Sequence, residues 1–122
     1  MTKKILLVED ERILAKMYED KLEEAGYKTD VMFSAEDALD YLTNEKPDLI
    51  LLDILLPRKN GVDFLELLKE IPGTSDIPVI GLSNYDDPVT KKKSFDLGVK
   101  EYLLKTQYTP KELISEIKKY LD

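Results

Sequence analysis

Short apolar runs alternate along the chain with longer segments in which apolar residues recur every three or four positions. The runs are KILLV (residues 4–8), YKTDVMF (27–33), DLILLD (48–53), IPVIGL (77–82) and KEYLL (100–104). Runs of this length indicate β-strands, whereas a spacing of three or four residues is typical of one face of an α-helix. The pattern therefore predicts five strands and five helices in strict alternation.

Capping and helix-breaking residues predict the helix ends. The first helix begins near Arg12 and ends at Gly26, since glycine tolerates the left-handed conformation that follows many helices. Ser34, Asp87 and Thr109 precede the second, fourth and fifth helices as N-caps. The third helix is expected to reach the Pro-Gly pair at residues 72–73, with the apolar residues Phe64, Leu65, Leu67, Leu68 and Ile71.

The apolar runs also predict the fold class. LILL (49–52) and VIGL (79–82) are apolar at successive positions, which indicates strands buried on both faces between layers of helices. A chain of 122 residues fits one domain. We therefore predict a doubly wound α/β domain with a parallel sheet, in which ligands bind at the carboxyl ends of the strands.

Composition and charge exclude several functional classes. The chain has no cysteine and no histidine, so it has no disulfide framework, no thiol nucleophile and no histidine base. A net charge of -7 gives phosphate backbones no general attraction, and we expect no direct nucleic-acid partner. The apolar runs are too short to cross a bilayer, and no signal peptide opens the chain, so we expect a cytoplasmic protein without membrane contact.

Polar residues follow the apolar runs at the edge where chemistry is expected. Glu9 and Asp10 follow the first strand, Asp53 the third, Ser83 the fourth and Lys105 the fifth. Taken singly, each has an ordinary explanation as a helix-terminus acid, a turn residue or a solvated lysine. Their joint placement favours a shared site. Three clustered carboxylates repel one another, and with a single lysine they are suited to Mg²⁺, with Asp53 as a nucleophile that forms an acyl phosphate.

These segments together resemble the receiver domain of two-component response regulators, from Lys4 to Leu121. The resemblance depends on the combination of VEDE (8–11), DLILLDILLPRKNGVDFL (48–65), PVIGLSN (78–84) and GVKEYLLK (98–105). It implies a flavodoxin-like, CheY-like (βα)5 fold with strand order 2-1-3-4-5. It also implies a single receiver domain over residues 1–122, with no output domain.

The resemblance assigns roles to the acidic residues. Asp53 would be the phosphoacceptor, and Mg²⁺ would be held by Asp10, Asp53 and the backbone carbonyl of Leu55. Glu9 would contact the metal directly or through water. Glu9 stands where many members of the family have aspartate, and its longer side chain is expected to shift the metal geometry without abolishing the site.

The resemblance also assigns a switch. Ser83 and Lys105 would hold the phosphoryl oxygens, and Tyr102 would be the aromatic residue that turns inward when Ser83 moves toward the phosphate. Lys105 is usually followed by proline, whereas Thr106 follows here. A cis Lys105–Thr106 bond would cost about 3 kcal/mol more than the trans form, and its geometry stays open at this point.

A chain without histidine needs an external phosphoryl donor, either another protein or a small acyl phosphate. The implied partner is a histidine kinase or a histidine phosphotransfer protein. The signal would leave through the face of the fourth helix, fifth strand and fifth helix, which includes Lys91–Lys93. We expect a receiver that phosphorylates and dephosphorylates itself rather than a dedicated enzyme. The alternative is a pseudo-receiver, a docking module without phosphorylation.

The residues around Asp53 exclude two other classes of phosphate-binding protein and predict how fast the phosphorylated form is hydrolysed. A haloacid-dehalogenase-like phosphatase needs a second aspartate at the position of Leu55, and a P-loop would need a Gly-Lys-Ser/Thr segment that is missing. Leu55, Asn84 and Tyr85 would border the path of the attacking water. Because Leu55 cannot orient water and Tyr85 is bulky, we predict slow hydrolysis of the phosphorylated form.

Overall fold

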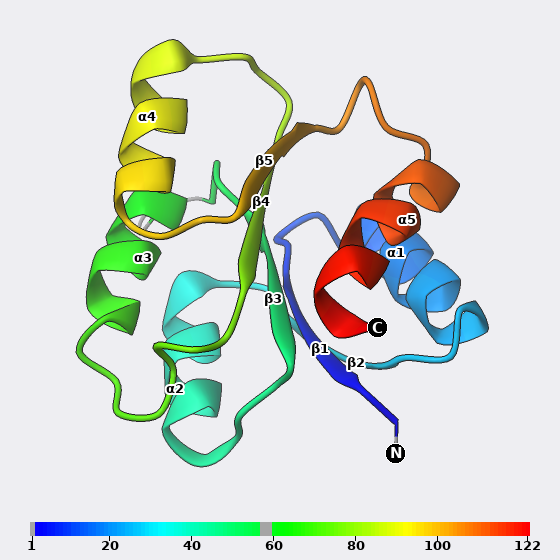
Figure 1. Cartoon of the computed structure of the whole chain (residues 1–122), viewed down its shortest axis with the longest axis horizontal. Coiled ribbons are helices and arrows are strands. Elements are labelled where there is room, and N and C mark those ends of the chain that lie inside the picture. Colours follow the sequence, from blue (N-terminus) through cyan, green and yellow to red (C-terminus); the bar gives the residue numbers. More distant parts are fainter. Residues whose placement is uncertain (1, 57–59) are drawn as a thin grey trace.

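The computed structural model describes residues 2–56 and 60–122 (Figure 1). The strands of the described chain are β1 (Lys4–Val8), β2 (Lys28–Met32), β3 (Leu49–Asp53), β4 (Val79–Ser83) and β5 (Glu101–Leu104). The helices are α1 (Arg12–Glu24), α2 (Ala35–Asn44), α3 (Gly61–Leu68), α4 (Pro88–Asp96) and α5 (Pro110–Leu121). The predicted alternation of strands and helices is confirmed.

The strands form one sheet in the order β2-β1-β3-β4-β5, and every neighbouring pair is parallel. Helices α1 and α5 cover one face of the sheet, and α2, α3 and α4 cover the other (Figure 1). The predicted fold class and strand order are therefore confirmed. The chain order reverses next to β1, so β1 and β3 enclose the position where such sheets bind ligands.

The core consists of one apolar cluster on each face of the sheet. Along β1, Ile5 and Leu7 join the cluster under α1 and α5, whereas Leu6 and Val8 join the cluster under the other three helices. All five positions of β3 and all five of β4 are buried. This burial on both faces explains why these two strands are apolar at successive residues.

The predicted N-caps are present. The Ser34 hydroxyl accepts from the Asp37 amide at 3.1 Å. Thr109 and Glu112 form a reciprocal capping box at the start of α5, with contacts of 3.2 and 2.9 Å. Gly26 follows α1 with φ of 100°, in the left-handed region where a side chain would be strained. Local sequence signals were sufficient at these ends because capping contacts span only a few residues.

The prediction for the end of α3 was wrong. The helix ends at Leu68, three residues before Ile71. The chain continues in tighter turns, because the Ile71 amide donates to the Leu68 carbonyl at 3.1 Å. The buried Thr74 hydroxyl lies 2.9 Å from the carbonyl oxygens of both Leu68 and Ile71 and satisfies the open helix end.

The helices were compared with the length and apolar character of a membrane span. None of those within residues 2–56 and 60–122 combines the length and the apolar character that a bilayer span requires.

Candidate functional site

The register of the sheet brings the predicted site residues to one edge. Asp53 ends β3 and lies opposite Leu82, and Ser83 ends β4 and lies opposite Leu104. Glu9 directly follows β1, and Lys105 directly follows β5. Because all strands point the same way, their carboxyl ends carry these side chains into one small region.

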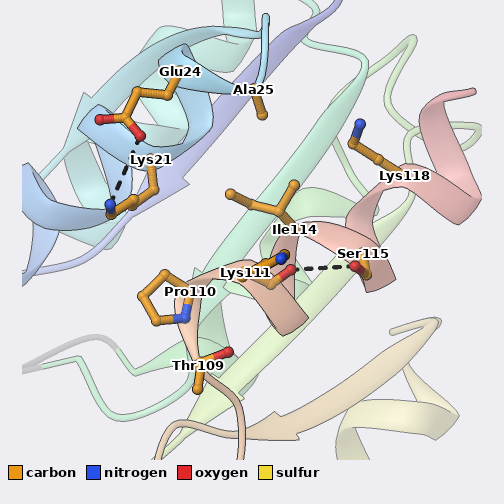
Figure 2. A pocket seen from close by; sticks show the side chains of 9 residues that line it. All are labelled: Lys21, Glu24, Ala25, Thr109, Pro110, Lys111, Ile114, Ser115 and Lys118. Carbon is orange, nitrogen blue, oxygen red and sulfur yellow. Dashed lines mark hydrogen bonds and ion pairs between the residues drawn. The ribbon is translucent and has the colours of Figure 1, made fainter.

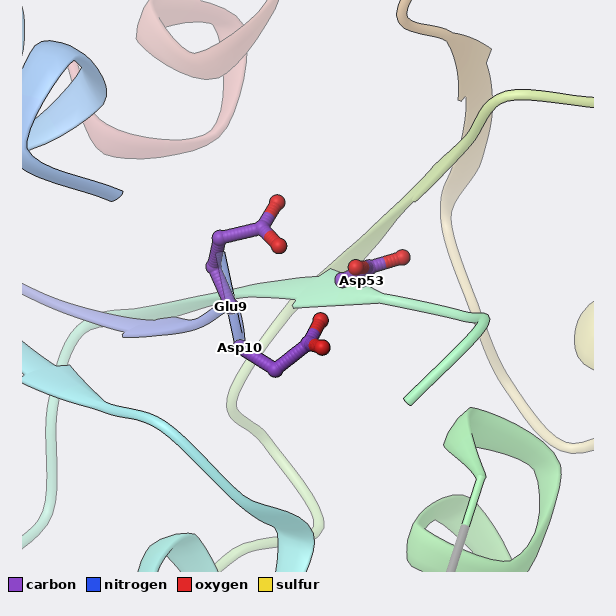
Figure 3. Close-up of side chains that lie close together, drawn as sticks. All are labelled: Glu9, Asp10 and Asp53. Atoms are coloured by element: carbon purple, nitrogen blue, oxygen red, sulfur yellow. The ribbon is translucent and has the colours of Figure 1, made fainter. Parts of the chain in front are cut away.

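Three carboxylates meet at this edge (Figure 3). Glu9, Asp10 and Asp53 each offer an oxygen atom, and these atoms lie within 4.8 Å of one another. Glu9 is 0% exposed and Asp53 is 5% exposed, whereas Asp10 is half-buried. Oxygen ligands gathered at this spacing fit a hard divalent cation, and the same spacing in its absence creates strong mutual repulsion.

Lys105 counters part of this negative charge. Its Nζ donates to Glu9 Oε1 at 2.7 Å and lies 3.3 Å from Asp53 Oδ2. Burial acts to lower the pKa of Lys105, but the hydrogen bond to Glu9 and the charges of Asp53 and Glu9 outweigh it and raise the pKa. Lys105 is therefore held in its charged form between the two carboxylates.

Glu9 uses both of its carboxylate oxygens. Oε1 accepts from Lys105, and Oε2 accepts from the Glu11 amide at 3.2 Å, at the start of α1. Burial is the largest cause that raises the pKa of Glu9, and the charge of Asp53 adds to it, while Lys105 acts in the opposite direction. The contact with the Glu11 amide was not predicted from the sequence. Glu11 is the N-cap residue of α1, and its own side chain makes no capping hydrogen bond.

The segment after β3 holds Asp53 in place. The Leu55 amide donates to Asp53 Oδ1 at 3.1 Å, which orients the carboxylate. The role of Gly61 as a supporting residue was not predicted from the sequence. Its amide donates to the Ile54 carbonyl at 2.8 Å, and a Cβ at this position would come within 2.7 Å of the Ile54 Cα. Residues 57–59 of the motif lie outside the described residues.

Ser83 and Tyr102 meet at one backbone carbonyl. The Ser83 hydroxyl donates to the Tyr85 carbonyl oxygen at 3.0 Å and accepts from the Tyr85 amide at 3.1 Å. The Tyr102 hydroxyl lies 3.3 Å from the same carbonyl oxygen. Tyr102 is 8% exposed, so its ring is already inside the protein in this structure. The two residues are linked through Tyr85, and among the described residues no hydrogen bond joins them directly.

Two apolar side chains stand in solvent beside the site. Leu55 is 48% exposed and Tyr85 is 67% exposed.

Lys91–Lys93 lie outside the cluster of site residues, on the exposed side of α4. The described residues contain no cis peptide bond, and the Lys105–Thr106 bond left open by the sequence is trans.

Comparisons with known proteins agree on one family. The sequence model described as the response regulator receiver domain matches residues 5–118. The structure is similar to a CheY-like response regulator receiver domain protein from Methanospirillum hungatei, with a TM-score of 0.90 and 30% identity over 100% of this chain and 95% of that chain. It is also similar to the signal receiver domain of a signal transduction histidine kinase from Syntrophus aciditrophicus, with a TM-score of 0.88 and 32% identity over 98% and 90% of the two chains. A response regulator receiver domain from Francisella gives a TM-score of 0.87 and 28% identity over 98% and 96% of the two chains.

Proposed function

The chain belongs to the family of response regulator receiver domains of two-component systems, and we propose that Asp53 is its phosphoacceptor. The observation that carries this proposal is the convergence of Glu9, Asp10 and Lys105 on Asp53 at the carboxyl edge of the sheet. An acidic cluster with one buried lysine suits the transfer of an anionic phosphoryl group to a carboxylate.

In the proposed reaction an Asp53 carboxylate oxygen attacks the phosphorus atom of an external donor. The donor is the phosphohistidine of a histidine kinase or of a histidine phosphotransfer protein, since this chain has no histidine. The P–N bond of the donor breaks, its electron pair stays on the imidazole nitrogen, and a P–O bond to Asp53 forms. Lys105, at 3.3 Å from Asp53 Oδ2, would stabilise the negative charge on the transferred group.

The donor set fits Mg²⁺. Asp10, Asp53 and the backbone carbonyl of Leu55 would hold the ion, because carboxylate and carbonyl oxygens are its preferred protein ligands. Bound Mg²⁺ would neutralise charge on the carboxylates and on the phosphoryl oxygens. Both oxygens of Glu9 already accept hydrogen bonds, from Lys105 and from the Glu11 amide. This favours a contact of Glu9 with the ion through water over direct coordination.

The shared carbonyl of Tyr85 supports a switch. When the Ser83 hydroxyl turns toward a phosphoryl oxygen, it gives up its hydrogen bond to the Tyr85 carbonyl. Tyr102 is then the side chain whose hydroxyl remains within reach of that oxygen. The change would pass along β5 to the surface formed by α4, β5 and α5, through which we propose that the domain docks on a downstream protein.

The test is phosphorylation by acetyl phosphate in the presence of Mg²⁺, followed by intact-protein mass spectrometry. We expect the mass of one added phosphoryl group in the wild type and none in Asp53→Asn. Asp86→Asn is the matched control, because Asp86 is an exposed aspartate outside the cluster, and it should be labelled as the wild type is. Asp10→Asn should need far more Mg²⁺ for the same yield. Transfer from a phosphorylated histidine kinase would extend the result to a protein donor.

A wild-type protein that stays unmodified, under conditions that label a known receiver domain, would overturn the proposal. That result would favour a pseudo-receiver that docks without phosphorylation. Equal labelling of Asp53→Asn and the wild type would show that another residue is the acceptor.

A further inference from the structure

A groove lies between α1 and α5 (Figure 2). The residues that line it do not include Glu9, Asp10 or Asp53, which together form the acidic edge of the sheet. Its volume is about 610 Å³, which falls within the range of binding clefts. The lining comes from the C-terminal part of α1 and from α5 with its N-cap. This side of α5 differs from the side that contacts β5, where the Tyr120 hydroxyl donates to Glu101 at 2.6 Å.

The floor of the groove is apolar. Ala25, Pro110 and Ile114 line it, and all three are half-buried. Ala25 and Ile114 also pack against the core cluster beneath α1 and α5, so the floor is a continuation of that core to the surface. The exposed part of this floor would become more stable if another apolar group covered it.

The rim of the groove is positively charged, although the protein has a net charge of -7. Lys21 forms an ion pair with Glu24 at 3.7 Å, so the charge of Lys21 offsets that of the one carboxylate in the groove lining. In the part of the chain that the structure describes, Lys111 and Lys118 have no ion-pair partner. Two lysines therefore remain available beside the apolar floor.

The spacing of these lysines defines what could bind. Lys111 and Lys118 are seven residues apart on α5, so they share a side of the helix and are separated by about 10.5 Å along its axis. Ile114 lies between them and lines the same groove. A complementary segment would present one apolar side chain between two carboxylates about 10 Å apart, as residues seven apart on a helix do.

We propose that the α1–α5 groove docks an acidic segment of a partner protein. One apolar side chain of the segment would cover Ala25, Pro110 and Ile114, and its flanking carboxylates would pair with Lys111 and Lys118. The surface is separate from the phosphoryl site and from the side of α5 that faces β5. Charge complementarity carries this choice of occupant, because the two lysines give the groove a local excess of positive charge on an acidic protein.

A second copy of the chain is the competing occupant. Asp63 and Glu66 of α3, with Glu70 just beyond its end, lie around the half-buried Leu67 and form an acidic surface with an apolar centre. Docking of α3 into the groove of another copy would join two different surfaces and would produce open-ended assembly rather than a closed dimer. Two chains of net charge -7 oppose this assembly, and for this reason we favour a partner protein.

The probe is an alanine-based helical peptide that carries two glutamates seven positions apart with a leucine midway. We would titrate it into the ¹⁵N-labelled full chain at low ionic strength and follow amide chemical shifts. We expect saturable shifts that centre on Ala25 and on residues 110–118, with a dissociation constant of about 1 mM or tighter. A peptide with lysines in place of both glutamates should not bind.

Charge reversal supplies the matched comparison. Lys111→Glu/Lys118→Glu should weaken binding of the acidic peptide about tenfold or more, which corresponds to about 1.4 kcal/mol. Lys28→Glu/Lys69→Glu makes the same change in net charge at two exposed lysines outside the groove, and it should retain binding within about twofold. Circular dichroism checks that both variants are folded.

Three results would overturn the proposal. The first is no saturable shift with the acidic peptide, and the second is an equal loss of affinity in the two double variants. The third is self-association of the peptide-free protein in sedimentation velocity that Lys111→Glu/Lys118→Glu abolishes, because it would assign the groove to a second copy. None of these outcomes depends on phosphorylation of Asp53, so the groove and the proposed function can fail separately.

Discussion

Replacing Lys105 with methionine would test the ion pairs at the site. In the described part of the chain, Lys105 is the only cation in ion-pair contact with Glu9 or Asp53, at 2.7 and 3.3 Å. Methionine keeps an unbranched side chain of similar length, so the main change is the loss of the charge. At a pH well above the raised pKa of Glu9, two buried carboxylates would then face each other without compensation.

The expected cost follows from burial and distance. Two unit charges 4 Å apart interact by about 4 kcal/mol at an effective dielectric constant of 20, and removing one partner of a buried pair typically costs about 3–5 kcal/mol. All three side chains are almost fully buried. We therefore expect Lys105→Met to lower the free energy of unfolding by about 3–5 kcal/mol, which lowers the Tm by about 10–20 °C for a domain of this size.

The assay is urea unfolding followed by circular dichroism, because the chain has no tryptophan. EDTA in the buffer keeps divalent cations from replacing the missing charge. Lys92→Met is the matched control: Lys92 pairs with Asp96 at 3.0 Å, but both side chains are exposed, and its loss should change stability little. Adding Glu9→Gln to Lys105→Met should recover part of the loss. If Lys105→Met costs no more than Lys92→Met, the argument from burial is wrong.

Three further predictions concern other parts of the molecule. Leu55→Asn and Tyr85→Glu should each shorten the lifetime of the acyl phosphate, because each introduces a group that can orient water. An unchanged rate of acyl phosphate decay in both variants would contradict this prediction. Thr29 has a buried hydroxyl without a hydrogen-bond partner in the described residues, so Thr29→Val should raise the free energy of unfolding by about 1–2 kcal/mol in urea titrations. A destabilised Thr29→Val would contradict the prediction. Tyr41 is partly buried, and its hydroxyl donates to Asp30 at 2.6 Å; burial and then this hydrogen bond raise its pKa to about 12. Because the pKa of Tyr41 in the folded protein lies above the ordinary value of 10.0, its contribution to the free energy of unfolding is complete below pH 10. This contribution is lost as the pH rises toward 12. Tyr41→Phe should remove this part of the pH dependence of unfolding, and an identical decline in both proteins would refute it.

The sequence predicted the fold because the signals for strands and helix ends are local. Apolar residues at successive positions indicated that β3 and β4 are buried on both faces, and both strands are fully buried. Ser34 and Thr109 identified helix starts because their capping contacts span three residues. The end of α3 was missed because it depends on Thr74, a residue beyond the helix whose hydroxyl contacts the carbonyl of Leu68, the last residue of the helix, and that of Ile71 in the following turn.

The sequence also identified which residues could share a site, but it did not specify their contacts. The order of the strands and their parallel direction are enough to bring Glu9, Asp53 and Lys105 to one edge. The sequence does not show that Lys105 pairs with Glu9, which is 96 residues away. Nor does it show that Glu9 also accepts a hydrogen bond from the Glu11 amide. Distances between such remote residues depend on strand register and side-chain packing.

The identity of the acidic edge was therefore determined by the sequence alone, through the polar residues that end four of the five apolar runs. The tertiary structure decided how these residues interact: which carboxylate pairs with Lys105, and which carbonyl joins Ser83 to Tyr102. It also decided that α1 and α5 leave a groove beside Lys111 and Lys118. The physical reason is that hydrophobic periodicity and capping act over one or two turns, whereas ion pairs, shared acceptors and grooves arise only where separate elements pack together.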